Sequence, residues 1–173
     1  MRANRQPTLR SAGGHERSQV GMVELFFDLV FVFAITQLSH GLLEQLTPLG
    51  ALHTGVLFIG AWWLWIYTTW CTNWLNPAAT PVRQLLFVLM LLALVMAAAL
   101  PHAFAERGLV FALAYVAQHL LRSAYMVHAF GAVSGHGRNF IRIFAWLAVS
   151  GTCWVLGGLS DPQSRLAWWT AAI

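Results

Sequence analysis

Four ionisable residues lie inside long apolar stretches of this sequence. Glu24 and Asp28 are four residues apart, and His119 and Arg122 are three residues apart. In a helix, each of these spacings places both side chains on one face. Where an apolar stretch crosses a bilayer, a charged side chain is costly, and such residues mark ion pathways, proton relays or binding sites. The chemistry that these residues predict is the handling of ions or protons.

We expect Asp28 and Arg122 to form an ion pair, because the sequence places them at similar depths. Counted from the ends of their stretches, Asp28 lies about 9 Å and Arg122 about 12 Å inside the apolar layer. Bidentate pairing would satisfy both charges, each of which would be costly alone. Two other interpretations stay open. The pair, with Glu24, could only fix helix packing, or Arg122 could extend to a lipid phosphate.

Other candidate ligands and nucleophiles lack suitable partners in the sequence. His40, His119 and His128 are expected at three different depths, so we predict no haem or metal site, although His119 beside Arg122 could relay protons. Cys71 and Cys153 have neither metal-ligand nor disulfide spacing. The sequence contains no phosphate loop, nucleophile elbow, zinc motif or dinucleotide fingerprint. We therefore expect no cofactor and no enzymatic activity.

Aromatic residues recur at helical spacing in the second apolar stretch. Trp63, Tyr67, Trp70 and Trp74 follow one another at intervals of three or four residues. Such a stripe usually faces lipid or a neighbouring helix, and a platform for a ligand is the alternative.

The composition indicates what kind of protein must hold these residues. Of the 173 residues, 58% are hydrophobic and 9% are charged, whereas soluble domains carry about 45–50% apolar and roughly 25% charged residues. The net charge is +4, but the arginines are scattered and form no basic face. This composition excludes an ordinary soluble enzyme, a disordered chain and a nucleic-acid-binding protein. It predicts the lipid bilayer as the main partner.

Five apolar stretches are near the length of about 20 residues that a helix needs to cross a hydrocarbon core. The predicted spans are Met22–Leu43, Gly50–Cys71, Val82–Leu100, Gly108–Phe130 and Phe140–Leu159. A sixth stretch, Leu166–Ile173, covers only about 12 Å of helix. The fold prediction is an all-α, polytopic transmembrane helical bundle over residues 22–173. It has at least five complete spans and the start of a sixth, as expected for a fragment of a longer protein.

The arginines predict the orientation of the bundle. Residues 1–21 are polar and arginine-rich, and we predict a disordered cytoplasmic tail. With this tail inside, the cytoplasmic segments hold seven arginines, and the outer loops hold only Arg107 and Arg165. An excess of basic residues on the cytoplasmic side is the rule for membrane proteins. We expect a multi-pass inner-membrane protein with a cytoplasmic N-terminus, and a homo-oligomer is compatible with this architecture.

Val23–His40 resembles the opening motif of the bacterial low temperature requirement protein A family, whose Glu-Leu-Phe-Phe-Asp core is intact at Glu24–Asp28. Gly137–Arg142 and Trp154–Gly158 are similar to the fifth-span region of that family. The resemblance implies a bacterial, multi-spanning inner-membrane protein with more helices than this chain, and it supplies no catalytic residue. The opening motif also resembles the Phe-Ser-Asp signature of a bacterial and lysosomal potassium-channel family, with Phe27 in place of its serine.

Two functions from different classes follow. The first is ion- or proton-linked transport or a channel-like role, with small ions or protons as partners. Its expected polar cluster is Glu24, Asp28, His119 and Arg122. The alternative is a non-transporting membrane protein that supports cold or stress tolerance through packing or partner binding. An intramembrane enzyme ranks third, because no nucleophile–base pair or metal set can be assembled.

Overall fold

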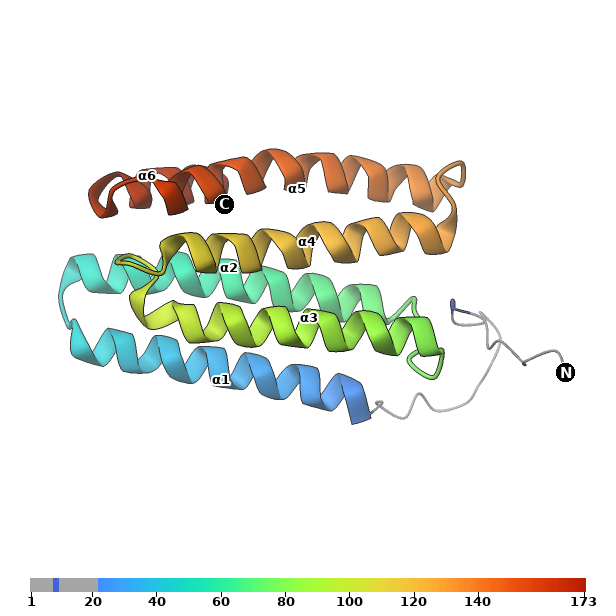
Figure 1. Ribbon diagram of the computed structural model, residues 1–173, viewed down its shortest axis with the longest axis horizontal. Coiled ribbons are helices and arrows are strands. Elements are labelled where there is room, and N and C mark those ends of the chain that lie inside the picture. The colour runs from blue at the N-terminus through green and yellow to red at the C-terminus, as the bar shows by residue number, and fades with distance from the viewer. Residues whose placement is uncertain (1–7, 10–21) are drawn as a thin grey trace, which may run out of the picture.

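The computed structural model is an elongated bundle of helices that lie side by side (Figure 1). It describes residues 8–9 and 22–173, except for the side chain of Glu24. Within these residues the chain is helical and contains no β-strand, so the predicted all-α fold is confirmed. The predicted tail falls almost entirely outside the described residues.

Each predicted span corresponds to one helix. The helices are α1 (Met22–Glu44), α2 (Pro48–Thr72), α3 (Thr80–Ala99), α4 (Gly108–Phe130), α5 (Gly135–Leu159) and α6 (Pro162–Ala172), with a 3₁₀ turn, η1 (Leu100–His102), after α3. Two helices begin several residues before the spans predicted within them. α5 begins at Gly135 rather than Phe140, and α6 begins at Pro162 rather than Leu166.

Local capping explains both early starts. The Ser134 hydroxyl accepts a hydrogen bond from the Gly137 N–H at 2.9 Å, which satisfies a backbone donor that the first turn of α5 leaves free. Pro162 occupies the first turn of α6, where a missing N–H costs nothing. Both helices therefore extend beyond the apolar residues from which the spans were predicted.

Among the described residues, four helices are long and apolar enough to cross a membrane, namely α1 from Leu25 onward, α2, α3 with η1, and α5. α4 has 23 residues, which is sufficient length, but Gln118, His119 and Arg122 lower its hydropathy. These three side chains are buried among neighbouring helices rather than exposed. α4 is therefore an internal helix with a polar stripe, unlike the other four predicted spans.

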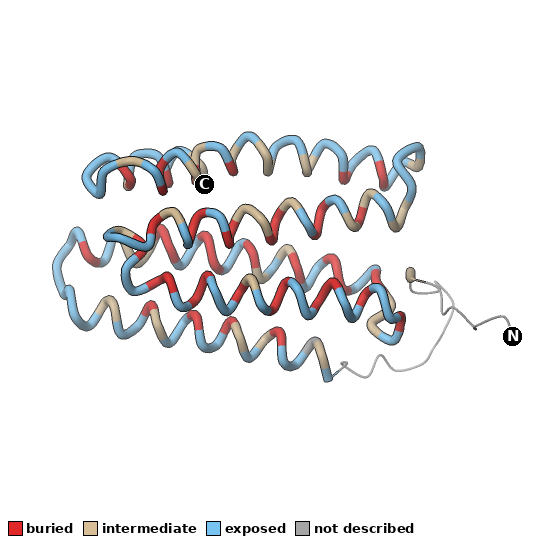
Figure 2. The backbone as a smooth tube through the Cα atoms, viewed as in Figure 1, coloured by how far each residue is buried: buried red, intermediate tan, exposed pale blue. Residues whose placement is uncertain are grey.

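The helix contacts explain why α4 can carry polar residues. α4 packs along α5 and α3 and also reaches α2, whereas α1 packs on α3 and α2. Figure 1 shows α4 between α5 on one side and α2 and α3 on the other, with α1 at the opposite edge of the bundle. Buried residues concentrate on α2, α3 and α4, and much of α1 and α5 is exposed (Figure 2). An apolar outer surface of this kind suits contact with lipid.

Candidate functional site

Of the predicted cluster, the structure places Asp28 apart from His119 and Arg122. Asp28 Oδ1 accepts a hydrogen bond from the indole N–H of Trp65 at 2.8 Å. Arg122 Nη1 donates instead to Thr68 Oγ1 at 2.8 Å and to the Leu64 carbonyl at 3.3 Å. The expected ion pair between Asp28 and Arg122 is therefore wrong. The side chain of Glu24 lies outside the described part of the chain, so its place in the cluster stays a prediction.

Helix α2 separates the two charged residues. Asp28 reaches α2 from α1, and Arg122 reaches it from α4. Their partners Leu64, Trp65 and Thr68 fall within about one helical turn. The two side chains thus lie at similar heights along α2 but against different faces of it. Equal depth in a sequence does not determine which helices are neighbours.

His119 and Arg122 do lie together, as their spacing predicts. Arg122 Nη2 lies 2.7 Å from His119 Nδ1. Both residues are buried, with Arg122 1% exposed and His119 2% exposed. The guanidinium carbon of Arg122 lies 4.8 Å from the centre of the Tyr67 ring, within the range of a cation–π contact. The described partners of Arg122 are thus all electrically neutral.

This geometry assigns the proton of His119. A guanidinium can only donate hydrogen bonds, so His119 Nδ1 must accept from Arg122. An imidazole that accepts at Nδ1 carries its proton on Nε2 and is neutral. The pair therefore has a single positive charge, on Arg122.

Three buried polar atoms of this region have no hydrogen-bond partner among the described residues. They are His119 Nε2, Arg122 Nε and Ser123 Oγ. Most buried polar groups in proteins have a hydrogen-bond partner, and a buried polar atom without one (an orphan atom) calls for an explanation such as a bound molecule. Among the described side chains, no carboxylate lies within ion-pair distance of Arg122. The site is therefore both positively charged and short of hydrogen-bond acceptors.

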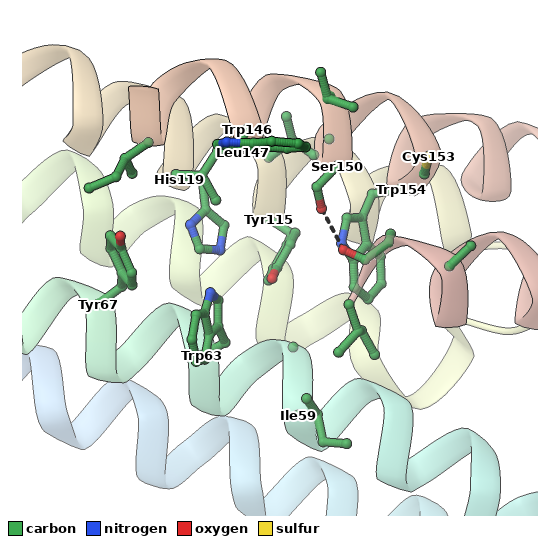
Figure 3. Close-up of a pocket in the computed structure, with 18 residues that line it drawn as sticks. Ile59, Trp63, Tyr67, Tyr115, His119, Trp146, Leu147, Ser150, Cys153 and Trp154 are labelled. Atoms are coloured by element: carbon green, nitrogen blue, oxygen red, sulfur yellow. Dashed lines mark hydrogen bonds between the residues drawn. The ribbon is translucent and has the colours of Figure 1, made fainter. Parts of the chain in front are cut away.

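A cavity of about 680 Å³ lies beside His119, between α2, α4, α5 and the end of α6. Figure 3 shows the His119 ring between Tyr67, Trp63 and Tyr115. The ring centres of His119 and Tyr115 are 4.6 Å apart. Sequence reasoning missed this cavity, although the aromatic stripe on α2 contained its signal. Trp63 and Tyr67 belong to that stripe and line the cavity.

Arg165 shows how a purely structural arginine differs from Arg122. Its Nε donates to the Gly157 carbonyl, its Nη1 to the Ala103 carbonyl and its Nη2 to the Ser160 carbonyl, each at 3.0 Å. The guanidinium thus joins the end of α5 to the loop before α4, and each of its nitrogens has an acceptor. Arg122 retains an unpaired nitrogen. The sequence placed Arg122 inside a predicted span and Arg165 in an outer loop, and it did not indicate that Arg165 would also be buried.

No group of three or more His, Cys, Asp or Glu side chains within the described residues could hold a metal ion. Cys71 and Cys153 are both free thiols. The polar centre is therefore formed by the imidazole and guanidinium of α4.

Comparison with known proteins identifies the family. The model of the bacterial low temperature requirement A protein (LtrA) matches residues 19–173. The chain belongs to the LtrA family. An uncharacterized protein of Rhizobium meliloti (strain 1021) is 46% identical over 160 residues, which cover 91% of this LtrA chain and 39% of that relative. No solved structure matches the chain significantly.

The segments that resemble the LtrA family have clear structural positions. The opening motif lies on α1, where Asp28 connects this helix to α2 through Trp65. Gly137–Arg142 lies in the capped start of α5. In Trp154–Gly158, the Trp154 carbonyl accepts from the indole N–H of Trp169 on α6 at 2.9 Å. In this LtrA chain, Asp28 and Trp154 therefore take part in hydrogen bonds between helices, and Trp154 also lines the cavity.

Proposed function

We propose that this LtrA chain belongs to an inner-membrane protein that carries out ion- or proton-linked transport, with His119 and Arg122 as the binding centre. The observation that carries the proposal is a neutral imidazole and a guanidinium buried in contact beside a cavity, with unpaired polar atoms on both. Ionisable groups inside membrane bundles are typical of ion pathways and proton relays. We place the N-terminus in the cytoplasm, because the arginine distribution favours that side.

The contact between the two side chains couples proton binding to a structural change. A proton on His119 Nδ1 would remove the acceptor of Arg122 Nη2 and bring two cations together. Either the guanidinium must move or an anion must enter. The titratable groups around His119 are Tyr67 from α2, Tyr115 and Arg122 from α4, and Cys153 from α5. Since none of these is a carboxylate, Arg122 dominates the electrostatics of the site.

A specific observation also favours the non-transporting alternative. The bonds from Arg122 to Leu64 and Thr68 connect α4 to α2, which is a packing function. Under this alternative, the His119–Arg122 pair stabilises the bundle, and its titration moves nothing across the membrane.

Proton flux in liposomes distinguishes the two functions. The chain is reconstituted around a pH-sensitive dye, and a pH step is applied from outside. We expect His119→Gln to abolish the flux, because an amide can still accept from Arg122 but does not bind protons near neutral pH. His128→Gln, on the exposed face of the same helix, is the matched control and should retain the flux.

The unfolding temperature in detergent completes this experiment. Under the transport proposal, His119→Gln keeps an unfolding temperature near that of the parent chain. A parent chain with no more flux than empty liposomes contradicts transport. A lower unfolding temperature with unchanged flux supports the packing alternative.

A further inference from the structure

We propose that the cavity beside His119 binds a small monocarboxylate with an apolar body. The anionic end would lie at His119 and the body against the aromatic walls. The cavity is part of the site proposed for transport, so the solute class named here rests on that proposed function. A carboxylate that enters with a proton would also resolve the charge conflict that protonation of His119 creates.

The size of the cavity indicates a molecule rather than a bare ion. Pockets of about 300–1,000 Å³ are usual for small organic ligands, and this one has about 680 Å³. A proton or a single inorganic ion needs far less space.

The orphan atoms define the polar end of the ligand. His119 Nε2 carries the proton of the neutral ring, so the atom without a partner is a donor and requires an acceptor. Arg122 Nε is a second unpaired donor, but it is buried and Arg122 does not line the cavity, so the direct contact falls to His119. The nearby guanidinium is not neutralised by any described carboxylate. An anionic oxygen satisfies this combination better than a neutral carbonyl, because a hydrogen bond with one charged partner is roughly twice as strong as a neutral one.

The walls define the remainder of the ligand. Trp63 and Tyr67 contribute rings from α2, Tyr115 from α4, and Trp146 and Trp154 from α5 (Figure 3). The Ser150 hydroxyl on the same wall already donates to the Ala172 carbonyl at 2.6 Å. Aliphatic residues complete this mostly apolar lining, and His119 adds a buried, unpaired N–H at one side of it. Aromatic walls bind flat apolar groups by offset or edge-to-face packing.

Calorimetric titration of the chain in lipid nanodiscs tests this proposal. The probe pair is benzoate and benzamide, which share a ring and a carbonyl but differ in charge. We expect benzoate to bind at least about tenfold more tightly. Comparable binding of both probes, or no binding of any carboxylate to the folded chain, would overturn the proposal.

Decanoate and decanol form a second probe pair, because a fatty acid from the bilayer also combines a carboxylate with an apolar body. A stronger preference for decanoate would identify the bilayer as the source of the carboxylate and would still support the class.

Two variants locate the binding in the cavity. His119→Phe keeps an aromatic ring but removes the donor, and we expect benzoate affinity to fall about ten- to a hundredfold. Trp146→Ala removes a wall residue that is 73% exposed and so leaves the fold intact. Trp146→Ala should also lower the affinity for benzoate, whereas His128→Phe should leave that affinity unchanged. Unchanged affinity in His119→Phe and Trp146→Ala, both folded by circular dichroism, would place the ligand elsewhere and overturn the proposal.

The binding and flux measurements fail independently. His119-dependent proton flux without carboxylate binding would reject the solute class and leave transport standing. Carboxylate binding that depends on His119, without any flux, would reject transport and leave the binding site standing.

Discussion

At the scale of the residue, the buried polar groups differ in whether all their hydrogen-bonding atoms have partners, and this difference indicates their roles. Arg165 has a carbonyl acceptor for each nitrogen and has the properties of a structural connector. Asp28 accepts from Trp65 across a helix interface, which joins α1 to α2. In the described chain, the buried side-chain atoms without partners belong to His119, Arg122 and Ser123. The site proposed for ligand binding is thus the one whose hydrogen bonding is incomplete.

The Asp28 partner can be verified by double-mutant cycles on stability. We expect Asp28→Ala and Trp65→Phe to couple by about 1.5–3 kcal/mol, because a hydrogen bond to a charged group is lost in each single variant. Asp28→Ala and Arg122→Met should be additive within about 0.5 kcal/mol, since the two side chains share no partner. Denaturation in detergent mixtures gives the free energies. Strong coupling between Asp28→Ala and Arg122→Met would instead support an ion pair between these two residues and contradict the contacts described here.

Only part of this site could be predicted from the sequence. The i, i+3 spacing correctly placed His119 beside Arg122, because helical geometry alone determines it. The Asp28 partner could not be predicted, since it depends on which helices are neighbours. The cavity depends on how well the helices around it fill the space between them. No local pattern encodes that fit.

At the scale of the element, the C-terminal end of α5 packs closely against the start of α4. An added Cβ at Gly158 would lie 2.9 Å from the Leu109 Cα and 3.0 Å from the Gly108 carbonyl oxygen. Because these are backbone atoms, they cannot move aside as a side chain could. Small residues of this kind let helices in membranes approach closely. The apolar pattern predicted the existence of both helices but not this contact.

Replacement of glycine by alanine tests this contact, because we expect opposite effects on the free energy of unfolding at two positions. We expect Gly158→Ala to destabilise the bundle by about 1–3 kcal/mol through overpacking. Gly55→Ala, where an added Cβ meets nothing within 4 Å, should instead stabilise by about 0.5–1 kcal/mol through helix propensity. Unfolding in SDS–detergent mixtures measures both variants. Stabilisation by both would mean that α4 and α5 are further apart than described.

At the scale of the whole molecule, the arginines at the two ends of the bundle differ in exposure and in hydrogen bonding. Arg83, Arg138 and Arg142 are exposed near the end where α2 meets α3 and α4 meets α5. At the other end, Arg107 donates to the Ala98 carbonyl at 3.0 Å, and Arg165 is buried among carbonyls. All five of these arginines keep their charge, since carbonyl acceptors are neutral. Three lie toward the first end and two at the second, which is the direction expected if the first end is cytoplasmic.

Single-cysteine labelling in intact cells tests this orientation. After Cys71 and Cys153 are replaced by alanine, Gln45→Cys and Val133→Cys place exposed thiols at opposite ends of the bundle (Figure 1). An impermeant maleimide should label Gln45→Cys from outside and Val133→Cys only after permeabilisation. The reverse pattern would invert the orientation and place the three arginines of the first end outside. Labelling of both from one side would mean that the bundle does not cross the membrane, and His119 would then need another route for protons.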